Sequence, residues 1–305
     1  MQRYIMRRAL QGVVTLFAVT LFIFFFGRLI GNPLDLMLPD DATPEEFQHA
    51  TEALGLDKPI HQQLYMFYVA ALRGDLGRSV RYNRPVTQIF MERFPNTLRL
   101  APVSMAIAFA LAIPLGVLAA FFRGRLPDRL ATLGAVLGMA IPHFWLGIVL
   151  IYLFAVTWDL LPPSGMGGPS HYVLPAATIG TGYAAGLMRL LRSSMLEVMG
   201  SDYVRTARSK GLKNSTVLLR HTMRNAVIPV FTLAGVLLAH AIAGALVTET
   251  VFAWPGVGRL TYEAVINRDY PLLQGVVMIA AIFVLVINLG VDVLYAYIDP
   301  RIRYT

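Results

Sequence analysis

Six apolar stretches, each long enough to cross a membrane as a helix, constrain the fold of this chain more than any other feature. A membrane-spanning helix needs about 20 predominantly apolar residues, because lipid offers the backbone no hydrogen-bond partners. Hydrophobic residues make up 56% of the 305 and charged residues only 14%, which excludes an ordinary soluble domain. The sequence therefore predicts an all-α membrane protein with six transmembrane helices, near residues 9–30, 97–121, 131–156, 172–192, 229–251 and 271–297.

The positions of Lys and Arg predict which loops face the cytoplasm. With a cytoplasmic N-terminus, sixteen of the 26 basic residues fall on the cytoplasmic side, close to the ends of the apolar stretches. Cytoplasmic loops carry an excess of Lys and Arg, so both termini are predicted to be cytoplasmic. The first apolar stretch is interpreted as an uncleaved helix, because no small-residue cleavage site follows it. The basic residues form no groove with interleaved aromatics, and nucleic-acid binding is not expected.

The chain divides into three parts by this pattern. Residues 1–30 are the N-terminus and first helix, residues 31–95 a folded extracytoplasmic segment, and residues 96–305 a five-helix core with a cytoplasmic loop at 193–228. The extracytoplasmic segment is either a cap that packs on its own helices or a docking surface for a partner, and the sequence leaves both open.

The extracytoplasmic segment contains signals for two helices. Thr43, Pro44 and Glu46 have the spacing of a capped helix start, and Gly55 would end that helix. A second helical pattern follows within residues 61–77. The segment is therefore predicted to be ordered.

The loop at 193–228 holds a dense cluster of basic residues. Ser201 or Asp202 can cap a short helix there, and Gly211 supplies the left-handed residue that ends it. A second helix is predicted to begin at Asn214 or Ser215 and to continue to the next membrane span. A basic helix beside a membrane can simply hold anionic lipid head groups, but that role does not require small residues followed by a glycine.

The residues of this loop resemble the cytoplasmic EAA loop of ABC importer permeases, in the version typical of the dipeptide, oligopeptide and nickel branch. An RTARSKG core at 205–211 is followed by HTMRNAVIP at 221–229. The broader family begins the loop with Glu-Ala-Ala, and this chain shares its departure from that pattern with the branch. The likeness extends through LGLDKPIHQQ (54–63), GDLGRSV (74–80), RSSMLEV (192–198), ETVFAWPGVGRL (249–260), NRDYP (267–271) and VDVLYAYIDPRIRY (291–304).

The resemblance implies the permease subunit of an ATP-driven importer in the cytoplasmic membrane of a bacterium or archaeon. Such a subunit forms half of a translocation pathway for small peptides, with nickel chelates or glutathione as alternative substrates. The expected partners are a second homologous permease subunit, two ATPase subunits or domains, an extracytoplasmic solute-binding protein and membrane lipid. ATP and Mg are expected on the ATPase subunits, while this chain is expected to be no enzyme and to bind no cofactor or metal.

The resemblance also assigns candidate site residues. Residues 202–213 are expected to form the coupling helix that docks on an ATPase subunit. Its coupling residues are Tyr203, Arg205, Thr206, Ala207, Arg208, Lys210, Gly211 and Leu212, and the supporting residues are His221, Arg224, Asn225 and Pro229. On the outer side, Trp254, Pro255 and Gly256 make a stiff turn, which is either structural or part of an outer gate or binding-protein contact.

The residues themselves restrict the energy source. A Walker loop needs a lysine preceded by glycine, and Lys58, Lys210 and Lys213 all lack one. The six histidines show no short metal-ligand spacing, and the chain has no cysteine. The alternative from a different class is a gradient-driven secondary transporter, for which Asp292 is the clear intramembrane acid.

Overall fold

A computed structural model describes residues 2–30, 34, 42–53, 55–242 and 245–298 of the chain. Over these residues the secondary structure is helical, with a single isolated bridge between Arg78 and Pro85. The helices are α1 (Gln2–Ile30), α3 (Pro44–Ala53), α4 (Ile60–Leu72), α5 (Val86–Phe121), α6 (Leu126–Ala140), α7 (His143–Leu150), the π-helical η1 (Ile151–Thr157), α8 (Ser170–Met199), α9 (Asp202–Ser209), α10 (Asn214–Thr216), the π-helical η2 (Val217–Thr222), α11 (Met223–Ala226), α12 (Ile228–Ile242), α13 (Leu246–Val251), α14 (Val257–Ile266) and α15 (Tyr270–Ile298).

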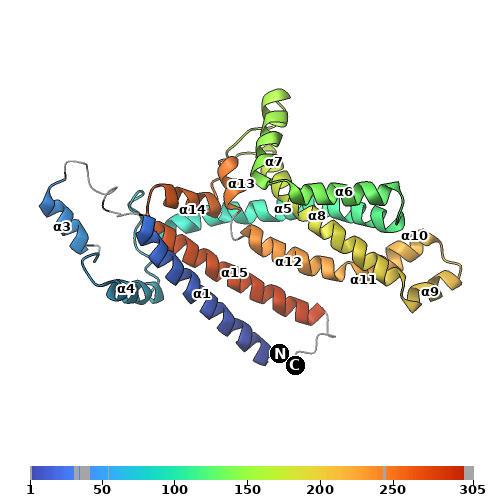
Figure 1. Ribbon diagram of the computed structural model, residues 1–305, viewed down its shortest axis with the longest axis horizontal. Helices are drawn as coiled ribbons and strands as arrows, with labels where there is room; N and C mark the ends of the chain where they lie inside the picture. Colours follow the sequence, from blue (N-terminus) through green and yellow to red (C-terminus); the bar gives the residue numbers. More distant parts are fainter. Residues whose placement is uncertain (1, 31–33, 35–41, 54, 243–244, 299–305) are drawn as a thin grey trace.

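The helices form an elongated bundle with different structures at its two ends. Figure 1 shows α3 and α4 at one end of the longest axis and α9 and α10 at the other. The long helix α5 runs between these ends beside α8, and α1 lies antiparallel to α15. Helix α7 projects from the side of the bundle (Figure 1). Helices α3 and α4 of the predicted extracytoplasmic segment, called the outer segment below, are therefore held far from the basic loop by the bundle.

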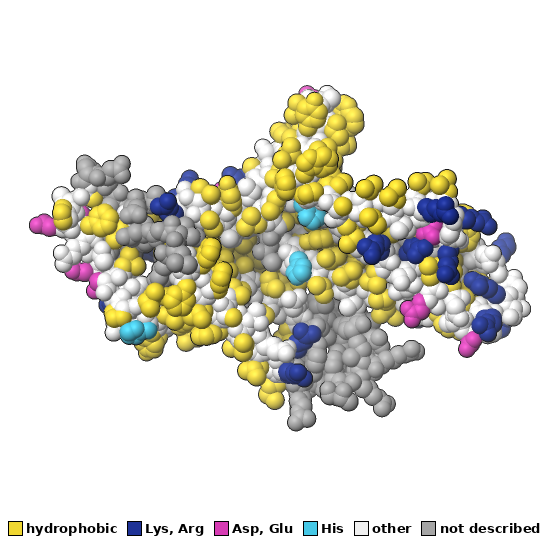
Figure 2. Space-filling view, in the orientation of Figure 1, with side chains coloured by type: hydrophobic (Ala, Val, Ile, Leu, Met, Phe, Trp, Pro, Cys, Tyr) yellow, Lys and Arg dark blue, Asp and Glu magenta, His cyan; other side chains and the backbone are white. Residues whose placement is uncertain are grey.

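Several helices are long and apolar enough to cross a membrane. Three do so as single helices, Met6–Phe26, Val86–Phe121 and Tyr270–Gly290, with mean hydropathies of 2.3, 2.3 and 2.6. Two bent pairs, α6 with α7–η1 and α10–α11 with α12, meet the same length and hydropathy criteria when each pair is taken together. Figure 2 shows hydrophobic side chains over much of the visible surface of the bundle, as expected where lipid is the solvent. The chain is a multi-pass membrane protein.

The structure corrects the prediction of a straight helix at 131–156. Helix α6 and the continuous α7–η1 unit occupy this range but meet at an angle of 102°. Ile141 has extended backbone angles (φ −76°, ψ 122°) and is followed by Pro142. A residue before proline is disfavoured in the helical conformation, and proline itself lacks the amide hydrogen that a continuing helix needs. The apolar run was thus correctly identified, but the proline divides it.

The predicted helix at 229–251 also ends earlier than expected. Helix α12 stops at Ile242, and α13 begins separately at Leu246. Ala245 precedes α13 with a non-helical ψ of 67°. Thr248 and Glu249 of α13 are buried polar residues, and Glu249 accepts a hydrogen bond from Thr97 of α5. Helix α13 therefore belongs to a folded part of the chain outside the candidate spans.

The predicted helix start in the outer segment is confirmed. The Thr43 amide donates to Glu46 Oε2 at 2.8 Å, and the Glu46 amide donates to Thr43 Oγ1 at 3.3 Å. These bonds form a reciprocal capping box. The bonds that the Thr43 amide and the Thr43 hydroxyl donate to the Glu46 carboxylate lower the pKa of Glu46 below its usual value. After α3 ends at Ala53, Gly55 adopts a left-handed φ of +64°.

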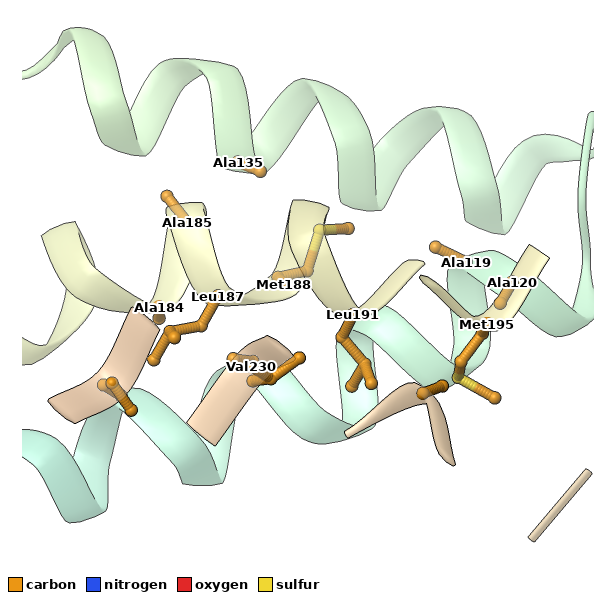
Figure 3. Close-up of a cluster of buried hydrophobic side chains, with 14 of the residues drawn as sticks. Ala119, Ala120, Ala135, Ala184, Ala185, Leu187, Met188, Leu191, Met195 and Val230 are labelled. Atoms are coloured by element: carbon orange, nitrogen blue, oxygen red, sulfur yellow. The ribbon is translucent and has the colours of Figure 1, made fainter. Parts of the chain in front are cut away.

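The core of the bundle lies where α5, α6, α8 and α12 meet. Figure 3 shows Leu187, Met188, Leu191 and Met195 along α8, with Ala119 and Ala120 of α5 beside Met195. Small residues let these helices approach closely: a Cβ built on Gly116 would lie 3.0 Å from the Leu191 side chain. The α5–α8 pair is therefore the rigid centre of the molecule.

Gly180 provides a direct test of the α5–α8 packing. A Cβ at Gly180 would lie 2.6 Å from the backbone oxygen of Ser104 on α5, whereas a Cβ at Gly186 on the same helix meets nothing within 4 Å. We expect Gly180→Ala to destabilise the protein by about 1–3 kcal/mol, because the helices must separate. Thermal unfolding in detergent should show a lowered midpoint for Gly180→Ala and little change for Gly186→Ala. Equal midpoints for the two variants would contradict the packing described.

Candidate site on the basic loop

Helix α9 is a short helix with defined ends. Ser201 occupies its N-cap position (φ −74°, ψ 154°), and Asp202 begins the helix. The Ser201 hydroxyl makes no capping bond to the helix; it donates to the Val198 carbonyl at 2.6 Å, which ties α9 to the end of α8. Gly211 follows the helix with φ +73°, the left-handed conformation that its sequence position predicts.

The two faces of α9 differ in burial. Val204 and Ala207 are buried and pack with Val217 of η2 and Val198 of α8. The other face is open to solvent, and the Tyr203 side chain on it is 43% exposed. The remaining exposed residues of this segment are Asp202, Arg205, Thr206, Arg208, Ser209, Lys210, Gly211, Leu212 and Lys213. Of the predicted coupling residues, Ala207 is thus the one that faces inward.

The second helix of the loop supports α9 but is less regular than predicted. It begins at Asn214 as expected, continues as the π-helical segment η2, and breaks at Val227 before α12, with a bend of 48°. The Asn225 amide group donates to the Tyr203 hydroxyl at 2.7 Å. Among the other predicted supporting residues, Arg224 is exposed, whereas His221 and Pro229 are partly buried. Of the four predicted supporting residues, Asn225 is therefore the one whose side chain is hydrogen-bonded to α9.

The loop presents a rigid basic surface at the end of the bundle. Figure 2 shows Lys and Arg side chains gathered around the end that Figure 1 assigns to α6, α8, α9 and α10. The exposed Leu212, at 39% of its surface, and Tyr203 add apolar and aromatic area to this charge. Lipid head groups would be attracted by the charge alone. A surface that combines charge with a fixed backbone and protruding apolar side chains is also suited to a protein partner.

The outer turn of Trp254, Pro255 and Gly256 is largely enclosed. Trp254 and Gly256 are buried, and Pro255 is partly exposed. The Trp254 indole donates to the Asn96 carbonyl at 3.1 Å, and the Asn96 amide group donates to the Pro255 carbonyl at 2.8 Å. The turn is therefore fastened to α5, and Pro255 is the residue of the three that is accessible to another molecule.

Glu249, whose role the sequence did not predict, organises this outer turn. Its side chain is fully buried, accepts from Thr97 Oγ1 at 2.8 Å, and accepts from the Arg259 amide at 3.1 Å. Burial raises the pKa of Glu249 above its usual value, while these hydrogen bonds and one from Gly258 act in the opposite direction. A carboxylate at the start of α14 satisfies amides that have no partner within the helix.

A second buried acid joins the outer segment to α15. Asp269 accepts from the Ser79 hydroxyl at 2.5 Å, from the Arg81 amide at 3.1 Å and from the Leu272 amide at 3.1 Å. The GDLGRSV and NRDYP stretches are therefore in contact. The sequence did offer a signal for Glu249 and Asp269. Each is the one acidic residue of its motif, ETVFAWPGVGRL and NRDYP respectively, and each motif lies beside a predicted membrane span.

Other residues considered from the sequence do not form a cluster. Among the described residues, no group of three or more His, Asp or Glu side chains could hold a metal ion. The side chain of Asp292 lies outside the described residues.

Fold and site together define a multi-pass membrane permease, in which apolar helices cross the membrane and a rigid basic helix stands exposed at one end. The chain belongs to the family of binding-protein-dependent transport system inner membrane components, which matches residues 112–304, and its first 101 residues match the N-terminal component of the same systems. It is thus an ABC importer permease subunit of the dipeptide, oligopeptide and nickel family. This family consists of permease subunits of transport systems, as the resemblance of the basic loop to the EAA loop predicted.

Relatives match the chain from end to end. The glutathione transport system permease proteins GsiC of Escherichia coli O6:H1 (strain CFT073), Shigella dysenteriae serotype 1 and Salmonella typhimurium (strain LT2) are each 40% identical over 305 residues, 100% of both chains. Among solved structures, the MetNI methionine ABC transporter in an inward-facing conformation has a TM-score of 0.60 at 18% identity, over 70% of this chain and 97% of that one. An amino acid ABC transporter has a TM-score of 0.53 at 15% identity, over 71% and 95%. These structures share the fold.

Proposed function

We propose that this chain forms half of the translocation pathway of an ATP-driven importer and is moved by ATPase subunits that dock on α9. The observation that carries the proposal is the exposed basic face of α9, held by Val204 and Ala207 on its buried side. The docking residues are proposed to be Tyr203, Arg205, Thr206, Arg208, Lys210, Gly211 and Leu212, with Ala207 fixing the helix from beneath. The other half of the pathway would be a second, homologous permease subunit.

We further propose six membrane-spanning segments with both termini in the cytoplasm. The three single helices, the bent pair of α6 with α7–η1, and α12 account for five, and α8, which covers the predicted span 172–192, is the sixth. Of the second bent pair, α12 is the part proposed to enter the membrane, while α10–α11 belongs to the loop. Arg and Lys residues cluster at the α9 end of the bundle (Figure 2), and the excess of positive charge belongs on the cytoplasmic side. Residues 31–95 then lie outside, where a solute-binding protein would deliver substrate, and 193–228 is the cytoplasmic coupling loop.

The outer turn is proposed to stiffen the wall of the outer mouth. Trp254 and Gly256 act from inside the fold, while Pro255 is the residue open to a gate or binding-protein contact. His221, Arg224, Asn225 and Pro229 are proposed to support the coupling helix from the second helix of the loop.

The substrate that we propose is a small peptide, with glutathione the first to be tested. The end-to-end match at 40% identity to glutathione permeases supports this choice over other small peptides. Nickel chelates remain the alternative cargo within the same machinery. Free substrate would be recognised by the external binding protein before it reaches this chain.

The proposed function is tested by reconstituting the chain into lipid vesicles with its partner permease, ATPase subunits and binding protein. We expect the binding protein loaded with glutathione to stimulate ATP hydrolysis and drive uptake of labelled glutathione into the vesicle lumen. Stimulation by a dipeptide or by a nickel chelate, but not by glutathione, would reassign the substrate and leave the transport mechanism in place. Failure of any ATPase subunit to co-purify with the chain would contradict the mechanism itself.

A further inference from the structure

An ion pair between a buried carboxylate and a partly exposed arginine connects α6 and α8 near the basic end of the bundle. Arg192 of α8 donates from Nε to Asp128 Oδ1 at 2.6 Å and from Nη2 to Oδ2 at 2.8 Å, so the two planar groups form a bidentate pair. The side chain of Asp128 is 6% exposed and that of Arg192 is 28% exposed. The ion pairs Arg84–Glu92, Arg205–Asp202 and Arg259–Glu263, by contrast, each join residues close together in sequence.

The Asp128 side chain also fixes the turn between α5 and α6. Its Oδ2 atom accepts from the Gly124 amide at 2.8 Å, and Gly124 has a left-handed φ of +76°. Thr132 of α6 places its hydroxyl 3.4 Å from Oδ1. The carboxylate therefore holds the α5–α6 turn, the first turns of α6 and the end of α8 in one arrangement.

On its other side, Arg192 is joined to the coupling helix with no free linker. Helix α8 ends at Met199, and the amides of Gly200 and Ser201 bond back to the carbonyls of Glu197 and Val198 at 3.0 Å each. Val198 also packs against the buried face of α9. A displacement of α9 must therefore be passed to the end of α8, where Arg192 lies.

Helix α6 leads from the ion pair toward the middle of the bundle. It runs from Leu126 to Ala140 and is bent by 102° into α7, which contacts α8 and α13. Helix α13 carries Glu249, the acid that organises the outer turn. The pair thus joins the coupling helix to the start of a route that ends at the outer face.

We infer that Asp128 and Arg192 are positioning residues that make α6 move together with the coupling helix when the ATPase subunits move it. The inference rests on the proposed coupling function of α9. A bidentate pair suits this task because it fixes orientation as well as distance, which a single contact between two apolar side chains does not. The pair would then act on transport without touching ATP or substrate.

The inference is tested first by the ratio of substrate transported to ATP hydrolysed in the reconstituted importer. Asp128→Asn removes the charge, and Arg192→Lys keeps the charge but loses the bidentate geometry. In Asp128→Asn we expect the ratio to fall by a factor of between about two and about thirty. This factor corresponds to the coupling free energies found for residues that contact neither ligand. In Arg192→Lys the ratio should fall by less. The matched control is Arg129→Gln, an exposed charge next to Asp128 that should leave the ratio unchanged.

A distance measurement tests the same inference with a readout that is independent of transport. The chain contains no cysteine, so spin labels can be placed at Ser209→Cys on α9 and Leu133→Cys on α6. In the otherwise unaltered importer, the distance between the labels should be the same with and without bound nucleotide. In Asp128→Asn the two states should give different distances, because α9 then moves without α6.

The outcomes separate this inference from the function on which it rests. A label distance that changes with nucleotide in the unaltered importer, or a normal transport ratio in Asp128→Asn, would overturn the inference and leave the coupling function standing. Loss of the ATPase subunits from the purified unaltered complex would remove the coupling function and the inference with it.

Discussion

Replacing Gly211 with valine is expected to abolish ATP-driven uptake while the chain still reaches the membrane. Gly211 has φ +73°, a conformation in which a β-branched residue is strained by about 1–3 kcal/mol. A Cβ atom added there would meet nothing within 4 Å, so the strain comes from the backbone conformation and not from a clash of the Cβ. The chain can relieve the strain by shifting the segment after α9, which displaces Leu212 from the docking surface. Uptake per molecule of membrane-inserted chain should fall at least about tenfold.

The matched substitution is Gly211→Asn. Asparagine tolerates the left-handed conformation far better than valine, although it is larger than glycine. Gly211→Asn should therefore retain most of the uptake. If valine and asparagine were equally active, the backbone conformation at this position would not matter for coupling, and the role assigned to Gly211 would be wrong.

Replacing Glu249 with alanine should have the largest effect on stability. Its carboxylate accepts from Thr97 Oγ1 and from the Arg259 amide inside the protein, and the side chain is fully buried. Alanine leaves these donors without partners and leaves a cavity, so we expect a loss of about 3 kcal/mol or more. The amount of folded chain in the membrane and the thermal unfolding midpoint should both fall.

Glu45→Ala provides the control for this prediction. Glu45 belongs to the segment 31–95 and, unlike Glu249 of α13, is exposed, in the first turn of α3. Its replacement should change the unfolding midpoint little. A Glu249→Ala protein as stable as Glu45→Ala would show that the buried carboxylate does not hold the outer turn together.

The sequence predicted the parts of this fold that depend on local patterns. Apolar length located α1, α5, α8 and α15, because an uninterrupted span of this kind has few other stable environments. The Thr43–Glu46 box and the left-handed Gly211 followed from side-chain spacing alone. The bend at Pro142 had a visible signal in the residue pair Ile-Pro, but hydrophobic length outweighed it in the prediction.

The parts that were missed depend on contacts between distant segments. Arg192 and Asp128 are 64 positions apart, and Thr97 and Glu249 are 152 apart. Each acid stood in the sequence as a single acidic residue beside an apolar stretch, and one sequence gives no sign of its partner. Similarly, the loop motif identified the residues of α9, but which of them face inward followed only from the packing of Val204 and Ala207.

The central claim, that this chain is a pathway without its own energy source, is tested most directly by uptake into vesicles of defined composition. One set of vesicles contains the two permease subunits alone, under an imposed proton or sodium gradient, and the other contains the full assembly with ATPase subunits, ATP and loaded binding protein. Accumulation of labelled glutathione only in the second set, with its loss in Gly211→Val, is the predicted result. Gradient-driven accumulation by the permease subunits alone would contradict the account.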